Sequence, residues 1–122
     1  MTQPEMTTAV RKPTPQVAII DIGGEVTGFA EEQLMVAYGE AANGTTRTII
    51  LNLEELGYMN SSGIGLLVTL LIRTQRQKQH LLAYGLSDHY QQIFELTRLN
   101  EAIGIHADET AALQAASGVH VR

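Results

Sequence analysis

TIILNLEELGYMNSSGIGLLV, residues 48–68, passes from a largely apolar segment through an acidic, glycine-containing stretch into a second apolar segment that opens with two serines. Residues 48–53 are apolar at nearly every position, which is typical of a strand covered on both faces, so we expect a central strand there. Residues 54–59 are expected to form a loop, and a helix is expected to begin at Ser61 or Ser62. The stretch therefore predicts a strand, a loop and a helix in succession.

Strand-like and helix-like segments alternate on either side of this unit. They are a strand at 17–22 that Glu25 and Val26 can extend beyond Gly23 and Gly24, a helix at 30–42 with Asn43-Gly44 as its stop, a strand at 81–85, a helix capped by Asp88, an edge strand at 103–105 and a helix from Asp108 to Gly118. The order β, α, β, α, β, α, β, α predicts an α/β layer with largely parallel strands and right-handed crossovers.

Length and composition limit the classes of protein. With 122 residues, 44% hydrophobic and 17% charged, the chain suits one globular domain. We expect this domain at residues 16–117, after a disordered or extended leader at 1–15 that carries three prolines and before a tail at 118–122. Neither a signal peptide nor an apolar run long enough for a membrane is found, so a cytoplasmic protein without membrane contact is expected. The net charge of −5 disfavours direct nucleic-acid binding.

Motifs that would indicate catalysis are missing from the sequence. Neither serine lies in G-x-S-x-G, no lysine follows either one by three positions, and Phe29-Ala30 stands where a phosphate-binding loop needs its Lys and Ser or Thr. The four histidines lack short metal-ligand spacing, and no cysteine is present. We expect no catalytic residue, no cofactor and no metal, and a small serine hydrolase is the least favoured alternative.

Two readings of Ser61 follow from its place at the start of a helix. Its hydroxyl could cap the helix by accepting a backbone N–H, which contributes about 1 kcal/mol. It could also accept a phosphoryl group, since a helix N-terminus with nearby glycines favours a dianion. Gly63 and Gly65 each cost helix propensity, so close backbone approach is expected at both, with tight packing on the sheet as the simpler reason.

The predicted helix is apolar nearly all round in its first two turns. We expect one apolar stripe to pack on the sheet and Leu66 and Leu70 to lie toward another side, partly exposed to a partner. The stripe consists of Ile64, Leu67, Val68, Leu71 and Ile72. Arg73, Arg76 and Lys78 follow, and no acidic residue occurs between Glu55 and Asp88. These cations favour the helix C-terminus through its dipole.

Residues 48–68 resemble the core signature of the STAS domain, and specifically of the bacterial anti-sigma factor antagonists, in which an aspartate-serine-serine/threonine-glycine motif opens a helix. GGEVTGF, residues 23–29, resembles a glycine-glutamate-hydrophobic-aspartate turn of that family, and residues 81–113 resemble its later elements, so the likeness covers about the whole chain after the leader. The resemblance implies a single α/β STAS domain, with a small mixed, largely parallel sheet and about four helices. It also implies a non-enzymatic regulator that binds an anti-sigma factor serine kinase and thereby releases a sigma factor. Phosphorylation by the kinase prevents binding, and a PP2C-type, metal-dependent phosphatase restores it.

Carried onto this sequence, the resemblance assigns phosphorylation to Ser61, with Ser62 as the second choice. The partner-binding residues are then Asn60, Ser61, Ser62, Gly63, Leu66 and Leu70. Asn60 stands where the family usually has aspartate, and Thr27 stands where its earlier turn often carries another. If the aspartate orients the hydroxyl or the metal of the phosphatase, phosphate exchange is expected to be poor. The alternative function is a non-switching STAS scaffold or sensor subunit of a stress-signalling assembly, in which Asn60 and Ser61 only cap the helix.

Overall fold

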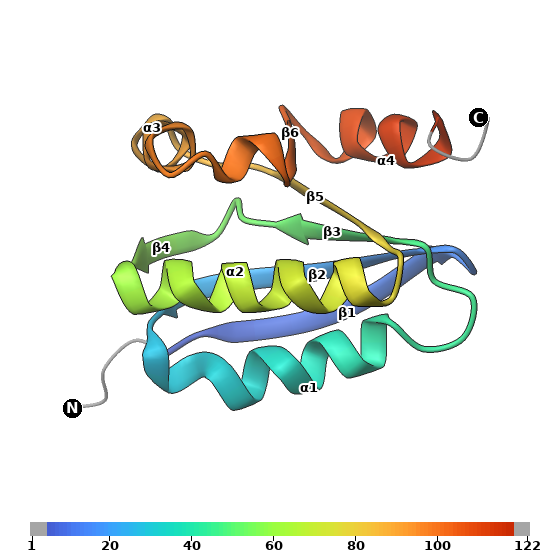
Figure 1. Cartoon of the computed structure of the whole chain (residues 1–122), viewed down its shortest axis with the longest axis horizontal. Coiled ribbons are helices and arrows are strands. Elements are labelled where there is room, and N and C mark those ends of the chain that lie inside the picture. The colour runs from blue at the N-terminus through green and yellow to red at the C-terminus, as the bar shows by residue number, and fades with distance from the viewer. Residues whose placement is uncertain (1–4, 119–122) are drawn as a thin grey trace.

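The structure, a computed structural model, describes residues 5–118 and shows a mixed sheet flanked by helices (Figure 1). The strands are β1 (Thr7–Thr14), β2 (Val17–Val26), β3 (Thr48–Asn52), β4 (Leu56–Met59), β5 (His80–Tyr84) and β6 (Gly104–His106). The helices are α1 (Glu31–Ala41), α2 (Ser61–Arg76), α3 (Asp88–Leu96) and α4 (Glu109–Gly118), with short 3-10 turns η1 (Gly28–Ala30) and η2 (Leu99–Glu101). Strand order is β1-β2-β3-β5-β6, and β4 pairs with β2. Among the strands of residues 5–118 only β1 pairs antiparallel, so the predicted α/β class with largely parallel strands is confirmed.

The long strand β2 organises the sheet because two different strands pair with it along one edge. Residues 17–21 of β2 pair in parallel with residues 48–52 of β3, which lies between β2 and β5 as the expected central strand. Beyond a register shift between Gly24 and Glu25, β2 pairs with β4, and Val26 lies opposite Met59. Gly24 has φ +79°, and a Cβ there would collide with the carbonyl oxygen of Glu5. The glycine pair therefore bends the strand without ending it, and the predicted continuation through Glu25 and Val26 is confirmed.

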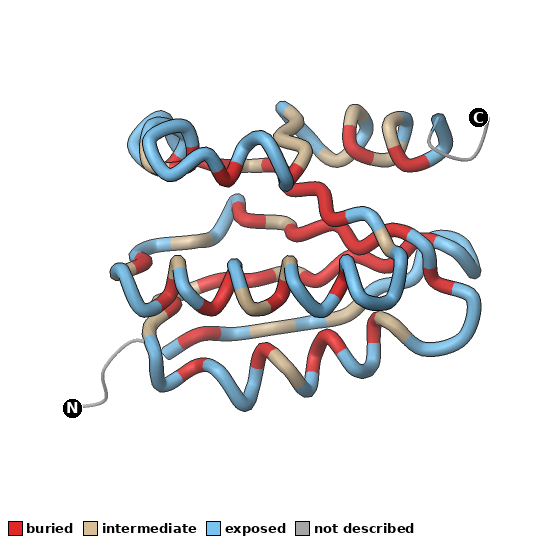
Figure 2. The backbone as a smooth tube through the Cα atoms, in the orientation of Figure 1, coloured by how far each residue is buried: buried red, intermediate tan, exposed pale blue. Residues whose placement is uncertain are grey.

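Alternating residues of the strands belong to two cores on opposite faces of the sheet. Figure 2 shows that the central strands are buried along most of their length. On one face, Ala18, Ile20 and Ile22 pack with the buried sides of α1 and α2, and α3 adds Tyr90 and Phe94 to the same core. On the other face, Val17 and Ile19 join a smaller core with α4. The helix expected at 30–42 is present, and the residues at helical spacing along its inner face are all buried: Ala30, Leu34, Ala37, Tyr38 and Ala41.

Residues 7–14, which we assigned to a disordered or extended leader, form the edge strand β1, so the sheet begins before the expected domain boundary at residue 16. The prolines misled the prediction, because Pro13 is tolerated where the β1–β2 register shifts, between Arg11 and Thr14. Most of the expected tail lies outside the described residues, since Gly118 ends α4 and residues 119–122 are not described.

Two further corrections concern loops and caps. The stretch expected as a loop at 54–59 contains β4, whose four residues are too short for a recognisable alternation. The cap of α3 is Ser87, whose hydroxyl accepts the N–H of Tyr90 at 3.4 Å, and Asp88 is the first helical residue. By contrast, the Oδ1 of Asp108 accepts the N–H of Ala111 at 2.8 Å, as expected for the start of α4. None of the helices described is long and apolar enough to cross a membrane.

Candidate functional site

Asn60 lies between the last residue of β4 and the first residue of α2, and it caps α2. Its backbone is extended, its Oδ1 accepts the N–H of Gly63 at 2.8 Å, and its own N–H donates to the carbonyl of Val26 at 3.3 Å. Ser61 is therefore the first helical residue, and the reading in which the hydroxyl of Ser61 caps the helix is wrong. Because Asn60 performs the capping, the hydroxyl of Ser61 is not needed for it.

Ser61 and Ser62 are both exposed at the N-terminus of α2. Their backbone N–H groups lie in the first turn, where a helix supplies no acceptor, and the helix dipole adds positive potential. Ser62 faces η1, since its Cβ lies 3.3 Å from the point where a Cβ on Gly28 would sit. The first turn thus presents two exposed hydroxyls at a position that tolerates an anion, and Ser62 lies close to η1.

Gly63 and Gly65 have different structural roles. Gly63 is buried, and a Cβ there would collide with the carbonyl oxygen of Val26 and lie 2.8 Å from the Cγ of Met59. Apart from its chain neighbours and the nearby helix backbone, no heavy atom of residues 5–118 lies within 4 Å of a Cβ built on Gly65. Close backbone approach is confirmed at Gly63, where α2 rests on the end of β2, and is wrong for Gly65.

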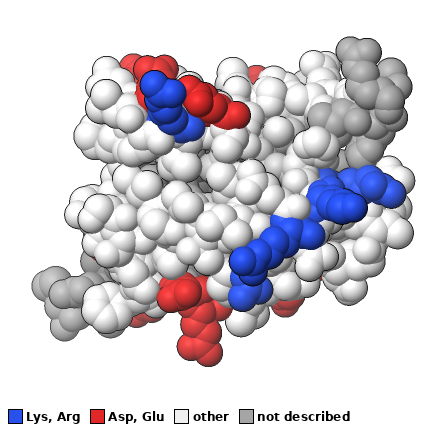
Figure 3. All heavy atoms as spheres, in the orientation of Figure 1, with Lys and Arg blue, Asp and Glu red and all other residues white. Residues whose placement is uncertain are grey.

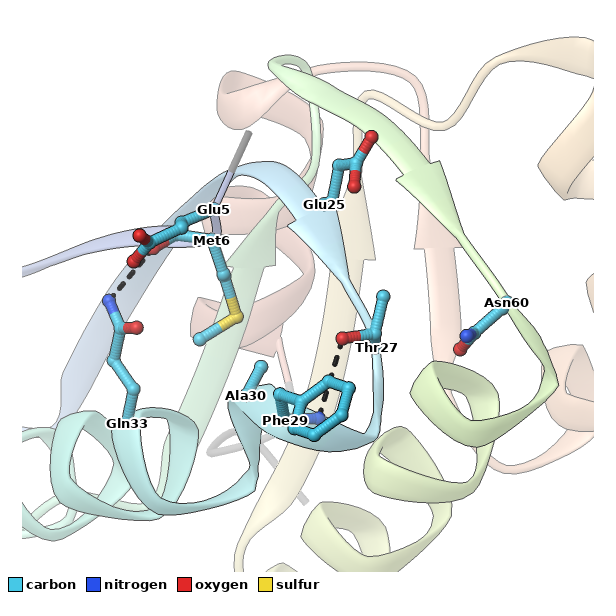
Figure 4. A pocket seen from close by; sticks show the side chains of 8 residues that line it. All are labelled: Glu5, Met6, Glu25, Thr27, Phe29, Ala30, Gln33 and Asn60. Atoms are coloured by element: carbon cyan, nitrogen blue, oxygen red, sulfur yellow. Dashed lines mark hydrogen bonds between the residues drawn. The ribbon is translucent and has the colours of Figure 1, made fainter. Parts of the chain in front are cut away.

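A hollow of about 400 Å³ lies beside the start of α2 (Figure 4). Its lining residues are Glu5, Met6, Glu25, Thr27, Phe29, Ala30, Gln33 and Asn60. Thr27 and Asn60, the two positions where the resemblance to the family led us to expect aspartate, both line this hollow because they follow the paired residues Val26 and Met59. The lining residues named above include the carboxylates of Glu5 and Glu25 and no Lys or Arg. The site therefore has a residual negative charge beside the helix N-terminus.

Tyr90 fixes the backbone immediately before the site, a contact that the sequence did not reveal. Its hydroxyl accepts the buried N–H of Met59 at 2.8 Å, and the side chain is 8% exposed. Tyr90 lies on the buried face of α3, but the partner of its hydroxyl depends on β4, which was not predicted. α3 therefore takes part in holding the junction between β4 and α2.

Leu66 and Leu70, expected as partly exposed contacts for a partner, are buried at 6% and 0% exposure. The close approach of Gly63 to β2 turns Leu66, Leu67 and Leu70 toward the core. Val68 and Ile72, expected to pack on the sheet, are instead 37% and 43% exposed. In a helix that is apolar nearly all round, the sequence does not fix which side faces the core.

A cluster of polar side chains lies away from this site, between β1 and the start of α4. Arg11 bonds Asp21 at 2.7 Å and Glu109 at 3.1 Å, and the Tyr84 hydroxyl donates to Glu109 at 2.8 Å. The bonds from Arg11 hold the pKa values of Asp21 and Glu109 below their usual range. Burial, together with the bond to Glu109, raises the pKa of Tyr84 to about 12. These groups tie β1 to the domain and take no part in the site at Ser61.

The arrangement described so far defines a class of small α/β domain that offers hydroxyls at an exposed helix N-terminus. Within residues 5–118, no group of three or more His, Cys, Asp or Glu side chains is placed to hold a metal ion. The model of the STAS domain family matches residues 8–112. The chain belongs to the STAS domain family, among its anti-sigma factor antagonists.

Curated relatives and solved structures agree with this assignment. The anti-sigma-B factor antagonist of Staphylococcus aureus is 30% identical over 87 residues, which cover 71% of this chain and 81% of the relative. The protein of the same name from Listeria monocytogenes is 27% identical over 86 residues, covering 70% and 75%. The unphosphorylated anti-sigma factor antagonist SpoIIAA superposes with a TM-score of 0.75 at 25% identity, covering 92% of this chain and 97% of that one. A sulfate transporter family protein from Wolinella succinogenes shares the fold alone, with a TM-score of 0.73 at 16% identity over 90% of this chain and 93% of that one.

Proposed function

We propose that this protein binds an anti-sigma factor serine kinase through the start of α2, and that phosphorylation of Ser61 by the kinase prevents binding. A PP2C-type phosphatase would restore the binding form, and the protein itself would carry out no chemistry. The observation that carries the proposal is that Ser61 is exposed at the first helical position. Its hydroxyl is not used as the helix cap, because Asn60 supplies the cap. The relatives named as anti-sigma factor antagonists support the choice of partner.

Charge explains how one phosphoryl group could switch the interaction. A phosphoserine adds about −1.5 to −2 charges, which the first-turn N–H groups and the helix dipole tolerate, so the isolated domain should remain folded. The neighbouring hollow offers Glu5 and Glu25 and no cation among its lining residues. A partner without matching cations would therefore bury an unpaired dianion, which costs several kcal/mol, or about two or more decades of affinity. Because the kinase needs ATP, the exchange would take place in the cytoplasm.

A non-switching scaffold or sensor subunit is the second candidate function. The replacement of the family aspartate by Asn60 favours it, because the amide keeps the cap but lacks the charge that could orient a hydroxyl or a phosphatase metal. In this case Ser61 would stay unmodified across growth and stress conditions, and the protein would be found in a stable large assembly.

The deciding experiment combines phosphosite mapping with binding. Mass spectrometry on protein recovered from its native cells, before and after phosphatase treatment, should find reversible phosphate on Ser61. Binding of the purified kinase should weaken by about a hundredfold or more for Ser61→Asp. Ser61→Ala should still bind but should not be phosphorylated, and Ser62→Asp tests the second-choice position. Equal binding by Ser61→Asp and wild type would refute the switch at Ser61. Loss of binding with Ser62→Asp alone would assign the phosphorylation site to Ser62 instead.

A further inference from the structure

The exposed face of α2 continues from Ser61 to the far end of the helix. Ser61, Val68, Ile72 and Arg76 follow one another at spacings of seven, four and four residues, which places them on one side of the helix. All four are exposed, and Gly65 between them leaves open space. At 1.5 Å per residue the face is roughly 22 Å long, which is the scale of an ordinary protein interface.

The charge along this face is one-sided. α2 contains no Asp or Glu, and its last turn carries Arg73 and Arg76. Figure 3 shows Lys and Arg side chains as a band across this end of the helix, whereas the surface over its first half is uncharged. The ion pairs in residues 5–118 all involve Arg11, so neither arginine of α2 has an acidic partner in this part of the chain. Free cations are gathered here on a protein whose net charge is −5.

A small hollow lies beside these cations, between α1 and α2. Its volume is about 190 Å³, and Tyr38, Arg73, Arg76 and Gln77 line it. The hydroxyl of Tyr38 donates to the Oε1 of Gln79 at 2.8 Å, and the guanidinium groups of Arg73 and Arg76 have no ion-pair partner within residues 5–118. The volume suits one side chain, and the charge suits a carboxylate, which guanidinium binds with two parallel hydrogen bonds.

We propose that this hollow is a second anchor for the anti-sigma factor kinase and takes an Asp or Glu side chain of that protein, while Val68 and Ile72 pack on an apolar strip of the same surface. The inference rests on the proposed function, and it adds that an acidic side chain of the kinase lies opposite the end of α2. An anionic membrane or a nucleic acid fits less well, because the cations are few, the adjoining face is aliphatic and the chain as a whole is acidic.

Charge reversal at the anchor is the direct test, with the full chain and the purified kinase encoded in the same genome. The double variant Arg73→Glu/Arg76→Glu should bind about tenfold or more weakly, and the association rate should lose part of its salt dependence. Val68→Ser/Ile72→Ser should also weaken binding. Arg98→Glu, an exposed charge reversal at the start of η2, is the control for reversing a surface charge away from α2 and should change the affinity less than about twofold. Changing the matching Asp or Glu of the kinase to Lys should restore binding to the reversed variant.

The outcomes separate this inference from the proposed function. If Ser61→Asp abolishes binding while Arg73→Glu/Arg76→Glu behaves as Arg98→Glu does, the anchor is wrong and the switch stands. If wild type does not bind the kinase at all, both are wrong. Vesicles of phosphatidylserine and a single-stranded oligonucleotide are the remaining probes. Binding of either that the double reversal abolishes, with kinase affinity unchanged, would overturn the protein anchor and assign the cations to that polyanion.

Discussion

The side-chain oxygen of Asn60 accepts the backbone N–H of Gly63 at 2.8 Å, as the aspartate of the family would be able to do at the same position. The substitution of amide for carboxylate therefore preserves the helix cap and removes one negative charge from the surface beside Ser61. A second neutral residue, Thr27, lies at the neighbouring strand end, so both departures from the family pattern alter the same region.

The first prediction separates the cap of Asn60 from its charge. Asn60→Ala removes the acceptor for Gly63 and should lower the free energy of unfolding by about 1 kcal/mol. Asn60→Asp keeps the acceptor and adds a favourable charge at the helix N-terminus. Its free energy of unfolding should equal that of wild type or exceed it by up to about 0.3–1 kcal/mol. Urea denaturation followed by circular dichroism measures both. Equal losses for Asp and Ala would contradict the role of the side-chain oxygen.

The second prediction uses Gly63 and Gly65 as a matched pair. Gly63→Ala forces a Cβ against the carbonyl oxygen of Val26 and should lower the free energy of unfolding by about 1–3 kcal/mol. Gly65→Ala meets open space and should raise it by up to about 1 kcal/mol, because alanine has the higher helix propensity. Thermal unfolding of the two variants should therefore shift in opposite directions. Two shifts of the same sign would show that the packing of α2 on β2 differs from the structure.

The third prediction concerns the bond between Tyr90 and Met59. Tyr90→Phe leaves the buried N–H of Met59 without its acceptor, which should lower the free energy of unfolding by about 1–3 kcal/mol. Amide hydrogen exchange should also speed up locally at residues 59–63, ahead of the rest of α2. Tyr58→Phe, at a residue that is 45% exposed, is the control and should change neither quantity. Uniform acceleration along the chain would indicate a global loss of stability rather than a loosened junction.

The elements that the sequence predicted correctly are those in which periodicity and burial agree. The helix at 30–42 has one apolar face, and the strand at 48–53 is apolar at nearly every position because helices cover both sides of β3. Ser61 was found at the start of α2 because a strand end, a connecting segment and a helix start follow one another. Each of these signals lies within one stretch of sequence.

What the sequence did not predict depends on contacts between distant segments. β4 has four residues and is defined by its pairing with β2, and β1 carries a proline that its edge position tolerates. The orientation of α2 follows from Gly63 meeting β2, which reversed the expected roles of Leu66 and Val68. The bond of Tyr90 to Met59 likewise joins residues that are 31 positions apart. Hydrophobic pattern alone does not encode these contacts.

The last prediction follows from the pKa values around Arg11. Its guanidinium bonds Asp21 and Glu109 and holds both carboxyl pKa values below their usual range, so the folded state releases these protons more readily than the unfolded chain. Stability from this source is complete above the ordinary carboxyl pKa of about 4 and disappears as the pH falls through the lower folded values. All three side chains are at least 30% exposed, so solvent screening limits the contribution to about 1 kcal/mol or less.

Arg11→Gln should therefore be less stable than wild type at pH 7, and the difference should shrink below about pH 4, where the carboxyls of the wild type protonate. The measurement is the urea midpoint of both proteins between about pH 2 and pH 7. Lys12→Gln is the matched control, because Lys12 donates to the carbonyl of Asn43 and the hydroxyl of Thr46 and not to a carboxylate, so its effect should be independent of pH in this range. A difference for Arg11→Gln that stays constant down to about pH 2 would mean that Arg11 stabilises the protein by packing on β2 rather than through its charge.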